Sequence, residues 1–181
     1  MQPLLQNYKF MSCILDGGVP LACLENTGGV KNVYIGEFDE ATAFTYDADD
    51  IIDTVTSAKT FYTFKFRPQT AGFNEELTKS IENGTTFWTE TVTMIFHKMD
   101  AVKRNKMLSL SGLSLHVIVQ TQNGDYWWIG LANGADVSAA TTGSGLAYGD
   151  KNHYDLTITG LEPVSAHQLD ATAFGTLTVA V

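Results

Sequence analysis

The sequence has few charged residues, and fewer basic than acidic ones. Only 17% of its 181 residues are charged, whereas a typical soluble domain carries about 25%. Eleven Lys and Arg stand against twenty Asp and Glu, which gives a formal net charge of −9. Nucleic-acid binders concentrate Lys and Arg to meet phosphates, and anionic membranes attract basic segments. This composition argues against a phosphate-tracking surface and against docking on a membrane.

Cysteine and long hydrophobic runs are also scarce. Cys13 and Cys23 are the two cysteines, and they predict free thiols in a reducing compartment, with a disulfide as the alternative. The four histidines are scattered and give no zinc-ligand spacing. No run approaches the roughly 20 apolar residues of a membrane-spanning helix, and polar residues interrupt the first apolar groups before an export signal forms. We therefore expect a protein that is made in a cytoplasm and kept there until it assembles.

Alternating apolar and polar residues predict strands through most of the chain. In the clearest case, Thr85–Lys98, apolar side chains line one face, with Glu90 as the exception, and the other face carries Thr89, Thr91 and Thr93. Alternation with a period of two indicates one face in a core and one polar face.

Turn and cap signals organise these strands. Asn83-Gly84 predicts a hairpin in which Phe73–Ile81 pairs with the strand that follows, and Asn-Gly pairs at positions 123 and 133 mark further turns. Asp100 predicts the N-cap of one short helix, Ala101–Leu108. We expect a mainly β fold, a single-domain antiparallel β-sandwich or half-barrel of eight to ten strands with one short helix, over residues 28–181. Residues 1–27 are expected to form an N-terminal arm.

No motif for catalysis, phosphate binding or metal binding can be identified. The Gly-rich stretch 143–151 lacks the Gly-Lys-Ser/Thr ending of a phosphate loop, and the acidic turn at 47–50 lacks the Gly and distal Glu of a helix-loop-helix calcium site. Several glutamates could supply a carboxylate pair, but nothing in the sequence pairs them; they are Glu75, Glu76, Glu82 and Glu90. We therefore expect no enzymatic activity, no cofactor and no metal.

Two groups of residues are candidates for contacts between subunits. Trp127 and Trp128 point to opposite faces if they lie in a strand, so one is expected in the core and the other at an interface, where Trp is enriched. A sugar-binding platform is the alternative. The basic residues around the expected helix either face solvent or meet an acidic patch on the next copy; they are Lys98, Lys103, Arg104 and Lys106. Lys103 and Arg104 are expected on the outer face of the helix.

Several segments resemble small virion structural proteins of tailed phages, especially phages that infect Bacteroidetes. They are Gly28–Ile35, Thr89–Phe96 with Asp100–Asn105, Asn123–Gly130 and Tyr154–Pro163. The order of strand, long hairpin, lone helix and further strands before a Thr-Gly-x-Glu-Pro motif is similar to that of tail-tube proteins. The resemblance covers roughly residues 28 to 165.

The resemblance implies a subunit that joins homo-oligomeric six-fold rings, which stack into a tail tube through which DNA passes without specific binding. Thr89, Thr91 and Thr93 are the candidates for the wall of that channel. Other tail or connector proteins are expected as further partners, and the virion tail as the location, after assembly in the host cytoplasm. A head–tail connector, a ring protein or a capsid decoration protein is the alternative, followed by a carbohydrate-binding module.

Overall fold

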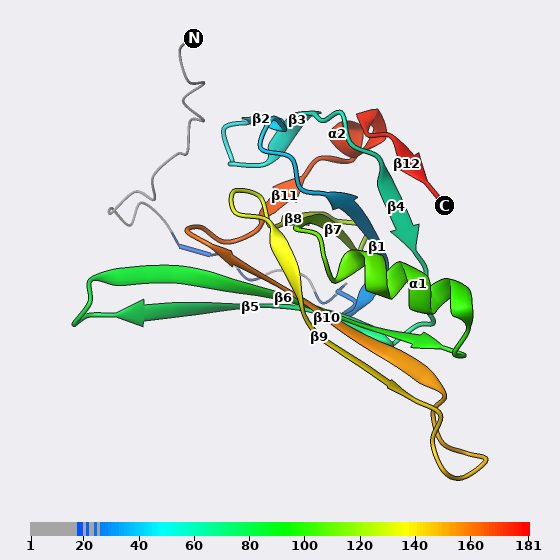
Figure 1. Ribbon diagram of the computed structural model, residues 1–181. Helices are drawn as coiled ribbons and strands as arrows, with labels where there is room; N and C mark the ends of the chain where they lie inside the picture. Colours follow the sequence, from blue (N-terminus) through cyan, green and yellow to red (C-terminus); the bar gives the residue numbers. More distant parts are fainter. Residues whose placement is uncertain (1–17, 20, 22–23, 25) are drawn as a thin grey trace.

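The computed structural model describes residues 18, 19, 21, 24 and 26–181, whose strands form one sheet that folds over itself into two layers (Figure 1). Most of the expected N-terminal arm, with Cys13 and Cys23, lies outside the described residues. The prediction of a mainly β fold is confirmed.

Eight strands form the larger layer. In spatial order they are β2 (Ala43–Tyr46), β3 (Ile52–Thr56), β11 (His167–Leu169), β8 (Tyr126–Ile129), β7 (Leu115–Thr121), β1 (Val30–Glu37), β4 (Phe61–Phe64) and β12 (Val179–Ala180). β7 lies between β1 and β8, and six of its seven residues are buried. An apolar strand buried on both faces is typical of the centre of a covered sheet.

Four strands form the second layer, which we call the four-stranded layer. In spatial order they are β9 (Ala135–Gly143), β10 (His153–Glu162), β6 (Thr85–His97) and β5 (Ala71–Ser80). All neighbours in it are antiparallel. It joins the larger layer through a single residue pair, Leu115 of β7 with Ala135 of β9. The chain crosses between the layers four times, after β4, β6, β8 and β10.

Two hydrophobic cores lie on the two faces of the larger layer. Successive side chains along a strand point alternately into one core and the other. Val33 and Val117 point into the interior core between the layers, whereas Tyr34 and Ile118 point into the second core. The interior core also receives the apolar face of β6, as the alternation predicts. The second core is covered by the β2–β3 hairpin and the C-terminal segment.

Two helices accompany the sheet. The predicted one is α1 (Ala101–Leu110), and the carboxylate of Asp100 caps it by accepting a hydrogen bond from the Lys103 amide at 2.8 Å. α2 (Ala171–Thr176) was not predicted, because six residues with Thr and Gly give a weak helical pattern. The sheet also departs from a purely antiparallel one, since β3–β11 and β4–β12 run parallel.

Candidate assembly surfaces

The four-stranded layer has two open edges. Among the described residues, β5 pairs only with β6, and β9 pairs only with β10 beyond its single contact with β7. Figure 1 shows the β5–β6 hairpin and the β9–β10 hairpin reaching past the larger layer in different directions. Unpaired N–H and C=O groups along a strand are a template for pairing with another chain.

The groups that β5 offers at its edge can be assigned from its pairing with β6. The Ile95 amide donates to the Thr70 carbonyl at 2.8 Å, next to the first registered pair of the two strands. Because bonded and non-bonded pairs alternate in an antiparallel ladder, Thr78 bonds to β6, and the backbone of Leu77 points to the open edge. Ten residues of β5 and nine of β9 make the two edges similar in length.

The face of the four-stranded layer that points away from the interior core is rich in threonine; we call it the threonine face. Thr91 and Thr93 on β6 lie opposite Thr159 and Thr157 on β10, and Thr89 follows on the same face. On these four strands the acidic residues of the threonine face are Glu76, Asp136 and Asp155, and it carries no Lys or Arg. The three threonines predicted to line a channel therefore share one polar, acidic surface.

The basic residues gather beside α1. Six of the eleven lie in the β4–β5 connection or in α1 with the residues before it; they are Lys65, Arg67, Lys98, Lys103, Arg104 and Lys106. Arg104 is exposed, as predicted. Lys103 is not, because its ammonium turns back to the carbonyls of His97 and Lys98 at 3.1 and 2.9 Å and to the Asp100 carboxylate at 2.8 Å. Lys103 therefore stabilises the start of the helix and offers little charge to a partner.

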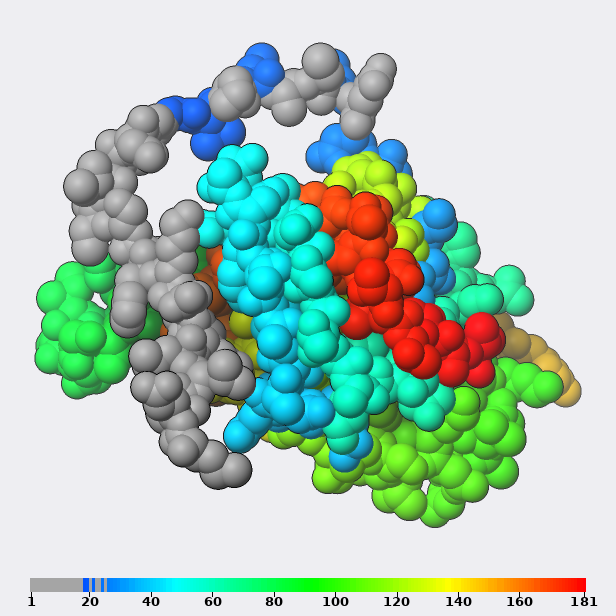
Figure 2. Space-filling view, turned by 90° about the horizontal axis from the view of Figure 1, so that it is seen from above, coloured from blue at the N-terminus to red at the C-terminus, as the bar shows by residue number. Residues whose placement is uncertain are grey.

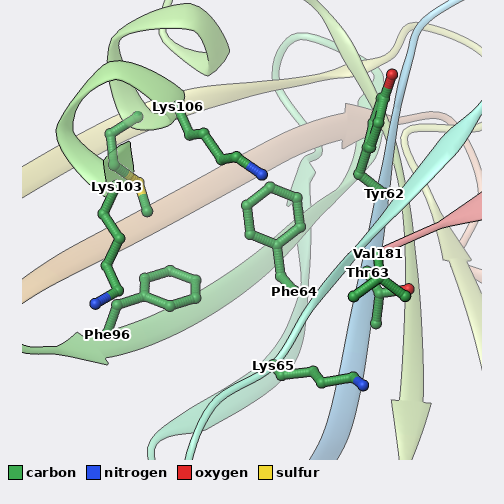
Figure 3. Close-up of a pocket in the computed structure, with 9 residues that line it drawn as sticks. Tyr62, Thr63, Phe64, Lys65, Phe96, Lys103, Lys106 and Val181 are labelled. Atoms are coloured by element: carbon green, nitrogen blue, oxygen red, sulfur yellow. The ribbon is translucent and has the colours of Figure 1, made fainter. Parts of the chain in front are cut away.

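A small pocket of about 130 Å³, the basic pocket, opens between α1 and β4 (Figure 3). The rings of Phe64 and Phe96, with centroids 6.1 Å apart, line it together with Tyr62, Thr63, Met107 and Val181. Lys65 lines it from the end of β4, and Lys103 and Lys106 from α1. Ammonium groups beside apolar walls suit an anionic group, because opposite charges attract and the walls screen that attraction less than open water does.

The two tryptophans take opposite sides of β8. The side chain of Trp128 is completely buried in the second core, with its ring 5.0 Å from that of Phe44 and 5.4 Å from that of Phe61. It offers no surface to a neighbouring subunit or to a sugar. Trp127 is half-buried against the interior core and remains the aromatic candidate for an interface.

Three glutamates, which the sequence did not pair, meet at one end of the four-stranded layer. Glu90 and Glu162 are buried, and Glu75 is half-buried. Glu75 and Glu90 are registered neighbours on β5 and β6, and Glu162 lies on β10. Their carboxylates accept hydrogen bonds from loop amides: Glu75 from Ala166 at 2.6 Å, Glu90 from Gly130 at 3.0 Å. Glu162 holds the amides of Ala132 and Asn133 at 3.1 and 2.9 Å. The glutamates therefore fix the β8–β9 turn and the β10–β11 loop to this layer.

Burial dominates the electrostatics of these glutamates. It raises the pKa of Glu90 to about 8, helped by the nearby charges of Glu162 and Glu75, although the bond from the Gly130 amide opposes the shift. Burial likewise raises the pKa of Glu75 and of Glu162. The sequence held one signal for this site, since Glu90 interrupts the apolar face of its strand.

In the part of the chain that the structure describes, no three His, Cys, Asp or Glu side chains are arranged to hold a metal ion. None of the described helices has the length and apolar character needed to cross a membrane.

Comparisons with known proteins identify no family for this chain. No family model matches the sequence, and no curated protein matches it. Among solved structures, a chain of the "Virion of native gene transfer agent (GTA) particle" is similar over 54% of this chain and 79% of its own length, with 12% identity and a TM-score of 0.31. At that TM-score the likeness carries no argument about function.

Proposed function

We propose that this chain is a structural protein of a tailed-phage virion, which self-assembles into rings that stack as a tail tube and conduct DNA. The observation that carries the proposal is the four-stranded layer with its two open edges of similar length. The role needs no catalysis, cofactor or metal. The six-fold symmetry and the tail location come with the sequence resemblance to tail-tube proteins.

The strand order suits closure between copies. The four strands alternate in direction, so β5 at one edge runs opposite to β9 at the other. When copies are related by rotation about one axis, β5 of one copy meets β9 of the next as an antiparallel pair. A ring of such contacts closes the sheet and leaves no edge exposed. Closure would also protect a chain with so little charge from uncontrolled aggregation through its strand edges.

The threonine face supports the choice of this layer as the channel wall. Its hydroxyl groups keep the surface wet, and its charged residues Glu76, Asp136 and Asp155 are all acidic. Like charge repels DNA phosphates, and the absence of Lys and Arg on this face removes the groups that would bind them. DNA could slide along such a wall without sticking.

The edge contact is tested by proline at neighbouring positions of β5. Leu77→Pro removes an N–H that points to the open edge, whereas Thr78→Pro removes one that bonds to β6. We expect Leu77→Pro to fold as a monomer and to need at least about five-fold more protein to assemble, since a lost interfacial hydrogen bond is worth about 1 kcal/mol or more. Thr78→Pro, the matched control, should lower the melting temperature of the subunit more than Leu77→Pro does.

Sedimentation velocity and negative-stain microscopy of both variants, beside thermal melts, give the readout. Assembly of Leu77→Pro at the same concentration as the parent would show that the β5 edge is not the contact. Rings that form but never stack would favour a connector over a tube.

A further inference from the structure

Charge is divided between two regions of the molecule. The segment 37–59 contains seven acidic residues and one basic residue, Lys59, which is already paired with Glu37 at 2.9 Å. Three of the eleven basic residues line the basic pocket instead, and Arg67, Lys98 and Arg104 lie within five residues of one of them along the chain. Figures 1 and 2 show the β2–β3 hairpin, which belongs to the acidic segment, and α1, which borders the basic pocket, at separate ends of the molecule.

Four acidic residues of this segment lie at the β2–β3 turn, and we call them the acidic turn. Asp47, Asp49 and Asp50 lie between the two strands, and Asp53 is the second residue of β3. The Asp47 carboxylate accepts hydrogen bonds from the amides of Asp49 and Ile51, both at 2.9 Å, and the Asp47 amide donates to the Ile51 carbonyl at 3.0 Å. These bonds hold the turn in one shape. Asp49 and Asp53 are exposed, so their side chains are available to a partner.

The basic pocket has cations to offer. Within the described part of the chain, the lysine ion pairs are formed by Lys59 and Lys103, and Lys65, Arg104 and Lys106 form none. Lys65 and Lys106 line the pocket, and Arg104 is exposed on α1 beside it. The ordering cost of a contact is reduced because the acidic turn is already fixed by its internal hydrogen bonds.

We propose that the acidic turn of one copy docks on the basic pocket of a second copy, as the head-to-tail contact between stacked rings. The inference rests on the proposed function and names the surface that joins one ring to the next. The contact uses two different surfaces, so it leaves one of each free at the ends and can be repeated without limit. Head-to-head contacts would bring like charges together, and a stack with a single direction results.

The test is a charge swap. Arg104→Glu with Lys106→Glu should leave the rings intact but raise the protein concentration needed for stacking about ten-fold, from the loss of two exposed ion pairs per contact. Asp49→Lys with Asp53→Lys should do the same from the other side. All four substitutions in one chain should restore stacking. Lys31→Glu with Lys151→Glu is the control, because it changes the net charge equally at exposed sites that do not line the pocket.

Microscopy of each variant distinguishes single rings from stacks, and melting curves show whether the subunit folds. The proposal is overturned if the Arg104–Lys106 variant stacks like the parent, if the control loses stacking equally, or if the four-fold variant does not recover. Should a variant fail to fold, a salt titration of the parent tests the same contact. Stacks of the parent should separate into rings as salt rises from 0.1 to 1 M, because the Debye length falls from about 10 to about 3 Å. Stacks of the parent that persist at 1 M salt would also refute the proposed contact. Failure of the proposed function looks different, because the parent would then form no rings at all.

Discussion

Replacing Glu90 with Gln should make the protein more stable than the parent at pH 8 and leave its stability near pH 4.5 almost unchanged. Glu90 is 1% exposed, and burial raises its pKa from 4.5 to about 8. Between these two values the folded protein holds a proton on Glu90 that the unfolded chain has released. The free energy of unfolding therefore falls as pH rises through this window, by up to about 1.4 kcal/mol per pH unit.

The sign follows from the raised pKa of an acid. The contribution of Glu90 to the free energy of unfolding is complete below pH 4.5, where Glu90 is protonated in both states. It is lost as pH approaches 8, where Glu90 ionises in the folded state as well. Gln is neutral throughout, and its amide oxygen can still accept the hydrogen bond from the Gly130 amide. A slope of the same sign should remain in the variant, because the pKa values of Glu75 and Glu162 are also raised by burial.

Urea denaturation at several pH values between 4.5 and 8.5 measures the effect. Glu76→Gln is the matched control, since Glu76 is exposed on the threonine face of β5, and its substitution should leave the slope as in the parent. If Glu90→Gln keeps the full slope of the parent, ionisation of Glu90 is not linked to folding.

Trp128→Ala should lower the free energy of unfolding by about 3–5 kcal/mol, as expected when a large side chain is removed from a core. The Trp128 ring makes edge contacts with Phe44 and Phe61 and lies 5.3 Å from the ring of His116. The cavity would open in the centre of the second core, which holds the β2–β3 hairpin to the sheet. For a domain whose total stability is about 5–15 kcal/mol, this is a substantial fraction.

Trp127→Ala is the control for Trp128→Ala. It removes the same side chain from the adjacent position, but Trp127 is only half-buried, so the cost to the free subunit should be less than half as large. Urea midpoints of the two variants provide the comparison. Equal losses would mean that the two faces of β8 are packed equally well.

Features set by neighbouring residues could be predicted from the sequence. The alternation in β6, the Asn83-Gly84 hairpin and the Asp100 cap each depend on a few adjacent positions. The pairing of distant strands could not be predicted, because β1 with β7 and β3 with β11 join segments that no local pattern connects. α2 is six residues long, so its stability depends on packing against the second core more than on its own sequence.

The candidate surfaces show the same division. Alternation placed Thr89, Thr91 and Thr93 on one polar face, and the structure has them there. The glutamate cluster depends on register between three strands, so a sequence can show only that Glu90 stands in an apolar row. The prediction that Lys103 lies on the outer face of the helix was wrong. Its long side chain lets the ammonium group turn back to carbonyls of its own chain, and helical periodicity does not reveal such a contact.

The central claim is that open edges of the four-stranded layer join identical copies into closed rings. Sedimentation velocity of the purified protein over a wide concentration range, with negative-stain images of the same samples, tests it most directly. We predict a shift from monomer to a closed ring and then to stacks as concentration rises. A single monomeric species at every concentration, with no rings on the grid, would contradict the account.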